Sequence, residues 1–149
     1  MHDRAWLVDK VRDVGERCAA ARVLRASRVV TKKYDDALKP VGLTVTQFSL
    51  LNAISYLKPD SFALIGKSLD VDRTTLSRNL SLLHKAGLVH LGEPGSNRKR
   101  EVLLTTRGAE RLEEAYPYWN EIQKEIEAIF SSDEYALLGQ MLARLRQLG

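Results

Sequence analysis

The sequence is poor in cysteine and in long hydrophobic runs, and each shortage excludes a class of protein. Its 149 residues include one cysteine, Cys18, so the chain can form neither an internal disulfide nor a multi-cysteine metal site. No stretch approaches the ~20 apolar residues of a membrane-spanning helix. Charged residues also interrupt the apolar ones throughout residues 1–13, which argues against a signal peptide. We therefore expect a cytoplasmic protein with no membrane partner.

A basic segment lies between a nearly neutral first half and an acidic end. Hydrophobic residues make up 44% of the chain and charged residues 28%, which is typical of a globular protein of one domain, residues 1–149. Residues 73–107 carry seven basic and two acidic side chains, whereas residues 108–149 carry four and eight. This distribution predicts a surface for a polyanion, with nucleic acid as the first candidate.

Capping and turn signals predict a mainly helical chain. Thr44 with Gln47, and Ser131 with Glu134, are capping-box patterns that open helices. Apolar residues recur at spacings of three and four between the turn signals, as in amphipathic helices. The predicted helices cover residues 16–38, 44–56, 62–69, 72–85, 109–130 with a bend at Pro117, and a final helix from residue 131.

The middle of the chain predicts a helix-turn-helix followed by a β-hairpin. Only Asp70 and Val71 separate two helical patterns, and helices joined this closely form a helix-turn-helix. In the second helix, polar residues lie opposite an apolar stripe that consists of Leu76, Leu80 and Leu83. The β-prone runs 88–91 and 101–105 then flank a basic turn at residues 94–100.

Four segments in this order carry a resemblance to a known family. They are Gly42–Leu51, Val71–Arg78, Leu83–Val89 and Leu104–Gly108. With them, the chain resembles the MarR family of winged helix-turn-helix transcription regulators from about residue 25 to residue 119. The resemblance implies a mainly α fold with a small β-hairpin wing. Residues 44–107 would form the DNA-binding head, and residues 1–40 and 108–149 a helical dimerisation region.

The resemblance also implies a homodimer whose first helix and last two helices interlock and place two heads on a pseudopalindromic operator. The sequence favours this independently, because the terminal helices hold more apolar residues than a compact head needs for its own core. These residues include Trp6, Trp119, Leu137, Leu138, Leu142 and Leu145. The alternative is that they complete the core of a monomer.

The second helix of the helix-turn-helix holds the candidate base readers. An α-helix fits the major groove of B-DNA, where short hydroxyl side chains and an arginine reach phosphates and base edges. Arg78 is the expected reader of a guanine edge, and Arg73 is expected to contact phosphate. The remaining candidates are Thr74, Thr75 and Ser77. The alternative is a solvated polar helix face without a ligand.

The hairpin tip places Arg98, Lys99 and Arg100 in sequence, as a cationic finger for the narrow minor groove. Arg98 matches the arginine of the family's Asp-x-Arg wing motif, but Ser96 stands at the aspartate position. The sequence therefore lacks the carboxylate that would orient Arg98. The alternative is a loop that only adds solubility.

Cys18 is the one residue with possible redox chemistry. We expect it near the start of a helix, where the helix dipole and the neighbouring Arg17 and Arg22 favour a thiolate. The region loosely resembles the peroxide-sensing branch of the family, but Cys18 lies two residues upstream of the sensor position. Leu24 also stands where that branch has a tyrosine. A structural or incidental cysteine is the favoured interpretation.

The sequence therefore predicts a sequence-specific DNA-binding regulator, a repressor that a small-molecule effector releases from DNA. The alternatives are a peroxide-sensing repressor that uses Cys18 and a winged-helix module that binds proteins. We expect no enzyme and no cofactor: His2, His84 and His90 lack metal-ligand spacing, and the sequence contains no Gly-rich phosphate loop.

Overall fold

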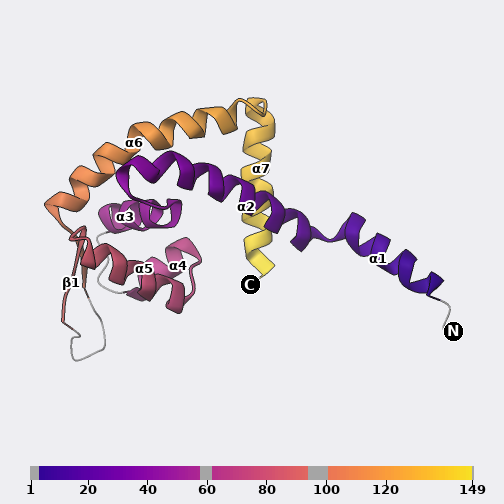
Figure 1. Ribbon diagram of the computed structural model, residues 1–149, viewed down its shortest axis with the longest axis horizontal. Coiled ribbons are helices and arrows are strands. Elements are labelled where there is room, and N and C mark those ends of the chain that lie inside the picture. Colours follow the sequence, from indigo (N-terminus) through magenta and orange to yellow (C-terminus); the bar gives the residue numbers. More distant parts are fainter. Residues whose placement is uncertain (1–3, 58–61, 94–100, 149) are drawn as a thin grey trace. The chain divides into compact units, whose positions relative to one another are not determined.

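The structure, a computed structural model, describes residues 4–57, 62–93 and 101–148. The chain divides into two compact units, Met1–Lys33 and Tyr34–Gly149. The described elements are α1 (Ala5–Arg17), α2 (Ala19–Leu38), η1 (Lys39–Val41), α3 (Val45–Leu57), α4 (Phe62–Leu69), α5 (Arg73–Lys85), β1 (Val89–Leu91), β2 (Val102–Leu104), α6 (Thr106–Glu127), α7 (Ser132–Leu145) and η2 (Arg146–Leu148) (Figure 1). This confirms the mainly helical fold with a small β-hairpin.

The first unit contains α1 and most of α2, and here the predicted helix boundary is wrong. We expected one helix from residue 16, but α1 runs to Arg17 and Cys18 breaks the helical path with a ψ of 105°. The predicted helix covered the run without glycine or proline that begins directly after Gly15. Glycine within a helix costs only about 1 kcal/mol relative to alanine, so it does not by itself end one.

The head, residues 44–107, is built around a continuous hydrophobic core. Its α3 begins as the capping box predicts: the Thr44 amide donates to Gln47 Oε1 at 3.0 Å, and the Gln47 amide donates to Thr44 Oγ1 at 3.2 Å. The core is made of side chains from α3, α4, α5, the hairpin and neighbouring segments. Its fully buried large residues are Leu38, Leu50, Leu51, Ile54, Ile65, Leu80, Leu83, Val89 and Val102.

Strand β1 pairs antiparallel with β2, and the hairpin is joined to the start of α6. The Thr105 hydroxyl donates to the Gly87 carbonyl at 2.7 Å and accepts from the Gly108 amide at 3.0 Å, so α6 begins at Thr106 rather than at residue 109. A Cβ on Gly108 would lie 2.1 Å from the Leu88 carbonyl oxygen. Only glycine therefore fits this joint.

Helix α6 continues through Pro117 as one element from Thr106 to Glu127. Trp119 on this helix stacks on Phe48 of α3, with 6.1 Å between the ring centroids. This corrects the assignment of Trp119 to the surplus of apolar surface, because it packs against the core of the head.

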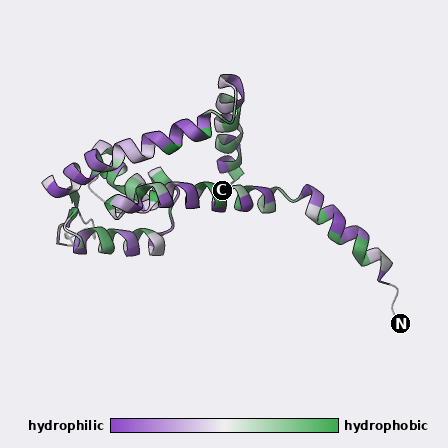
Figure 2. Ribbon diagram, turned by 45° about the horizontal axis from the view of Figure 1, so that its top comes forward, coloured by the Kyte–Doolittle hydropathy of each residue, from purple (hydrophilic) through white to green (hydrophobic). Residues whose placement is uncertain are grey.

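Helix α7 opens with the predicted capping box, in which the Ser131 amide donates to Glu134 Oε2 at 2.8 Å. None of its residues is buried, although apolar and polar residues share the helix (Figure 2). Its exposed apolar side chains are Leu137, Met141, Leu142 and Leu145. Among the described residues, no helix has both the length and the apolar character to cross a membrane.

Candidate nucleic-acid interface

The turn between α4 and α5 is closed by two backbone features. Asp70 adopts a φ of 50°, in the left-handed region, and the Val71 amide donates to the Gly66 carbonyl at 3.0 Å. A Cβ on Gly66 would lie 3.2 Å from the Val71 carbonyl oxygen, so the small residue permits this close approach. The predicted tight connection of a helix-turn-helix is confirmed.

Asp72 caps the first turn of α5. Its Oδ1 accepts from the Thr75 amide at 2.9 Å, which satisfies one of the free amides at the helix start. Hydrogen bonding from the Thr75 side chain, then from its backbone, lowers the pKa of Asp72 below its usual value. The Asp72 cap therefore determines the residue at which α5 begins.

Helix α5 has one face in the core and one in solvent. Leu76, Leu80 and Leu83 are buried. The five residues proposed to read DNA are all exposed at its N-terminal half: Arg73, Thr74, Thr75, Ser77 and Arg78. They are therefore accessible to a large ligand such as a duplex.

The described part of the wing is its base. Val89 lies opposite Leu104 and Leu91 opposite Val102, and the Gly92 amide donates to the Glu101 carbonyl at 3.0 Å. The predicted cationic tip, Arg98, Lys99 and Arg100, and Ser96 beside it lie outside the described residues. Their role in DNA binding stays a prediction.

Cys18 lies between α1 and α2, partly exposed. Its Sγ is 3.4 Å from the Ala21 amide, and its carbonyl accepts from the Arg22 amide at 3.3 Å. The expected position at a helix start is thus close to the observed one. The guanidinium of Arg22 is directed to the Glu16 carbonyl, so that contact does not activate the thiol.

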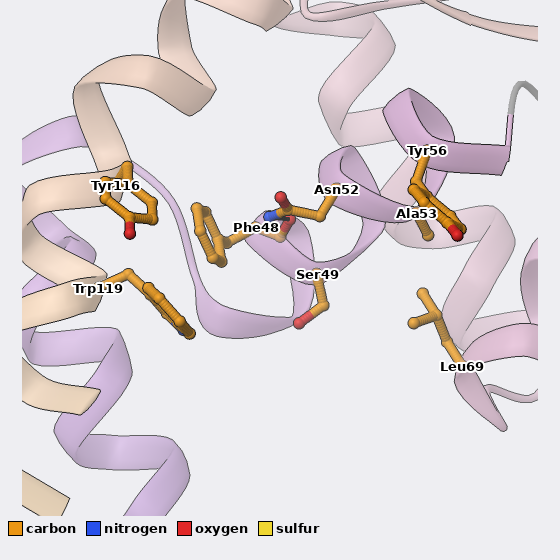
Figure 3. A pocket seen from close by; sticks show the side chains of 8 residues that line it. All are labelled: Phe48, Ser49, Asn52, Ala53, Tyr56, Leu69, Tyr116 and Trp119. Atoms are coloured by element: carbon orange, nitrogen blue, oxygen red, sulfur yellow. Dashed lines mark hydrogen bonds between the residues drawn. The ribbon is translucent and has the colours of Figure 1, made fainter. Parts of the chain in front are cut away.

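An open pocket of about 470 Å³ lies between α3, α4 and α6. Half of its lining residues carry aromatic rings, and two others are small polar residues (Figure 3). The lining residues are Phe48, Ser49, Asn52, Ala53, Tyr56, Leu69, Tyr116 and Trp119. Asn52 is held in place by a 2.9 Å bond from its Nδ2 to the Phe48 carbonyl.

These lining residues were not predicted from the sequence. Tyr56 is 88% exposed and Tyr116 is 56% exposed, so neither contributes to the core that the helical periodicity reveals. The available signal was the presence of two tyrosines off the apolar stripe of their helices. Such a signal does not show that residues 60 positions apart share one wall.

Known proteins resemble this chain in sequence and in structure. A sequence profile of the MarR family matches residues 41–100. The regulator MosR of M. tuberculosis is 34% identical in its crystal structure, with a TM-score of 0.79 over 89% of this chain and 95% of the other. The chain belongs to the MarR family.

Two further matches are transcriptional regulators. MosR has also been solved in complex with DNA, with 35% identity and a TM-score of 0.72 over 87% of this chain and 99% of that one. The uncharacterised HTH-type transcriptional regulator YwoH of Bacillus subtilis is 25% identical over 76% of this chain and 82% of its own length. This MarR-family chain is a transcriptional regulator with a DNA-binding winged-helix fold, and not an enzyme.

Proposed function

We propose that the protein is a homodimeric, sequence-specific DNA-binding repressor that a small-molecule effector releases from its operator. The observation that carries this proposal is the division of α5 into a buried face and an exposed one. Leu76, Leu80 and Leu83 lock the helix into the core, so its hydroxyl and guanidinium groups are presented on a rigid support. Rigid presentation favours base readout in the major groove.

The polar residues have distinct proposed roles. Arg78 pairs with a guanine edge, while Thr74, Thr75 and Ser77 contact phosphates and base edges. Arg73 at the helix start contacts phosphate. In the wing, Arg98, Lys99 and Arg100 enter the minor groove. These last three residues are proposed from the sequence alone.

The homodimer is supported by apolar surface that the chain does not cover. In α7, Leu137 is 51% exposed and Met141 is 53% exposed. In α1, Val11 and Val14 are each more than 60% exposed. Exposed stripes of this extent mark interaction sites, and a second copy would bury them. Two heads would then face a pseudopalindromic operator.

The effector proposal is supported by the aromatic pocket. Its apolar walls with a few polar groups are typical of small-molecule sites. The Ser49 hydroxyl and the Asn52 amide offer hydrogen bonds, and none of the lining residues that the structure describes carries an ionised side chain. We therefore propose a planar ligand with a hydrogen-bonding group.

The DNA-binding proposal is tested on a duplex that the protein selects from a random library. Because cationic side chains displace counterions from phosphates, the affinity should fall steeply between low and physiological salt. A flat salt response, or no selected duplex, would favour the protein-interaction module instead. Sedimentation of the same sample reports the dimer.

Two arginine variants distinguish a residue that reads a base from one that contributes to DNA affinity without reading a base. Arg78→Ala should weaken binding by about 1–3 kcal/mol and relax the preference at one base pair. Arg98→Ala should weaken binding to all sequences more evenly. Equal loss of specificity in both variants would contradict the proposed division of roles.

The pocket is tested by fluorescence with phenol as a simple aromatic probe. The chain has two tryptophans, so a Trp6→Phe background leaves Trp119 as the only reporter. Saturable quenching should be lost in Tyr116→Ala, whose side chain is exposed and can be removed without opening the core. Unchanged quenching in that variant would place the ligand elsewhere.

A further inference from the structure

Helix α7 is attached to the rest of its unit in an unusual way. A helix is normally positioned by an apolar face packed on a core. None of the residues of α7 is buried, and four of its apolar side chains are exposed: Leu137, Met141, Leu142 and Leu145. Beside a ring contact between Tyr135 and Phe130, with 6.1 Å between the centroids, polar contacts hold its two ends.

At the first end, the side-chain amide of Gln123 joins three helices. Its Oε1 accepts from the Tyr34 hydroxyl of α2, and its Nε2 donates to the Tyr135 hydroxyl of α7 at 2.7 Å and to Glu127 Oε1 at 2.7 Å. Burial raises the pKa of Tyr34, and electrostatic interactions with Tyr135 and Glu127 raise it further. The hydroxyl therefore stays protonated and can donate. The first turn of α7 is thereby tied to both α6 and α2.

At the other end, an ion pair joins η2 to the helix-turn-helix. The Arg146 guanidinium contacts Asp70 Oδ2 through Nε and Nη2. Asp70 is the turn residue with positive φ that lies directly before the cap of α5. The C-terminal end of α7 is therefore linked to the turn that precedes α5, the helix proposed to read DNA.

We propose that the Gln123 contacts and the Arg146–Asp70 ion pair set the position of α7 against the head, and thereby the separation of the two reading helices in the dimer. The second part rests on the proposed function. If α7 forms the dimer seam, its angle to the head determines how far apart the α5 helices lie. A dimer reads half-sites about 34–36 Å apart, one turn of DNA, so small changes in this angle alter the preferred operator.

The strength of the two attachments differs. The ion-pair side chains are 63% and 58% exposed, so solvent screens them, and their coupling should be up to about fivefold in an equilibrium constant. Tyr34 is only 9% exposed, so the loss of its Gln123 partner leaves a hydroxyl without a hydrogen bond. The Gln123 end should therefore matter more than the ion pair.

The attachment is tested by a distance measurement that requires neither DNA nor a dimer. Spin labels at exposed sites on α5 and α7, introduced as Lys85→Cys and Gln140→Cys in a Cys18→Ser background, report the position of α7. Dilution with unlabelled protein removes distances between subunits. We expect a narrow distribution for the parent protein and broader or shifted ones for Arg146→Gln and for Gln123→Met.

Matched variants separate the ion pair from general charge effects. Arg144→Gln removes an equal charge near the end of α7, and among the described residues Arg144 makes no ion pair with the helix-turn-helix, so its distribution should match the parent. Arg146→Lys should restore most of the parent distribution. Asp70→Asn tolerates the left-handed backbone, and combined with Arg146→Gln it should add little to either single change.

The operator consequence is measured on the selected duplex with one base pair added to or removed from its centre. The parent should discriminate among these duplexes, and Arg146→Gln should reduce the discrimination by up to about fivefold, with a larger reduction in Gln123→Met. Unchanged distance distributions in both variants would overturn the attachment. Altered distributions with an unchanged spacing preference would overturn its role in operator choice. A parent that binds no duplex would instead contradict the proposed function, while the distances still decide the attachment.

Discussion

Helices α5 and α7 are similar in length and both are amphipathic, yet their apolar residues differ in burial. Helix α5 has 13 residues and buries Leu76, Leu80 and Leu83 in the core of the head. Helix α7 has 14 residues and buries none. The same pattern in a sequence therefore indicates an apolar face but does not indicate which chain covers it.

The difference matters for what each helix can do. A helix that is covered by its own core can present its polar face as a fixed surface, as α5 does with Thr74 and Arg78. A helix with an uncovered apolar face gains stability when a partner arrives, and that gain depends on protein concentration. The contrast leads to four measurable expectations.

The largest expected effect separates the two helices directly. Leu80→Ala should lower the free energy of unfolding by about 2–5 kcal/mol, because it opens a cavity beneath a fully buried side chain. Leu142→Ala, at a side chain 45% exposed, should instead reduce stability mainly by weakening the dimer. Urea unfolding at two protein concentrations checks this. A loss in Leu142→Ala that is the same at both concentrations would show that α7 packs within its own subunit.

Two glycines provide a second contrast between tight and open packing. Gly108→Ala should destabilise the protein by about 1–3 kcal/mol, since its Cβ would lie 2.1 Å from a backbone oxygen that cannot easily move. Gly139→Ala in α7 meets nothing within 4 Å and should stabilise the helix by roughly 0.5–1 kcal/mol. Thermal unfolding of the two variants gives the comparison. Equal losses would mean that α7 is as closely packed as the wing joint.

A smaller effect concerns the carboxylates at the starts of the two helices. Hydrogen bonds lower the pKa of Asp72 at α5 and that of Glu134 at α7, the latter chiefly through the Ser131 backbone amide. A lowered folded pKa gives stability that is present above the unfolded value, about 3.9 for Asp and 4.3 for Glu, and that is lost as the pH falls through the folded value.

Amide variants test this pH dependence one helix at a time. Asp72→Asn and Glu134→Gln keep a hydrogen-bond acceptor but cannot ionise, so each should flatten the acid limb of the stability curve. Unfolding measured between pH 6 and pH 3 checks the slope. A slope as steep as that of the parent in both variants would assign the acid sensitivity to other carboxylates.

The smallest effect is expected at Cys18. Its Sγ accepts from the Ala21 backbone amide, and the chain has one cysteine, so a reversible disulfide would need a small thiol or a second subunit. We expect peroxide to leave DNA binding nearly unchanged, in the parent and in Cys18→Ser alike. Rapid, reversible release of DNA that disappears in Cys18→Ser would instead establish a thiol sensor.

Local chemistry made most of the fold predictable. The capping boxes at Thr44 and Ser131 marked helix starts correctly, because a hydroxyl and a side-chain acceptor three residues later satisfy amides within one turn. The break at Cys18 was not predictable in this way, because neither glycine nor proline marks it. The start of α6 at Thr106 depends on the contact of Thr105 with Gly87, which is 18 residues away.

The candidate site was predictable only in part for the same reason. The exposed face of α5 follows from helical periodicity once Leu76 and Leu80 are assigned to the core. The pocket depends on the packing of α3 against α6, which brings Tyr56 and Tyr116 to the lining of one pocket. The Arg146–Asp70 pair joins residues 76 positions apart, which no local pattern reveals.

The bond from Arg111 Nη1 to the Val41 carbonyl, at 2.7 Å, has a consequence for the order in which the protein is made. Its partners are 70 residues apart, so the turn after α2 leaves the ribosome long before its anchor exists. At about 5–20 residues per second, the delay is roughly 4–14 s. The apolar residues of α3 also wait for Ala115 of α6 to complete their core. During that interval the head lacks part of its core, so we expect its folding to finish only after α6 has been synthesised.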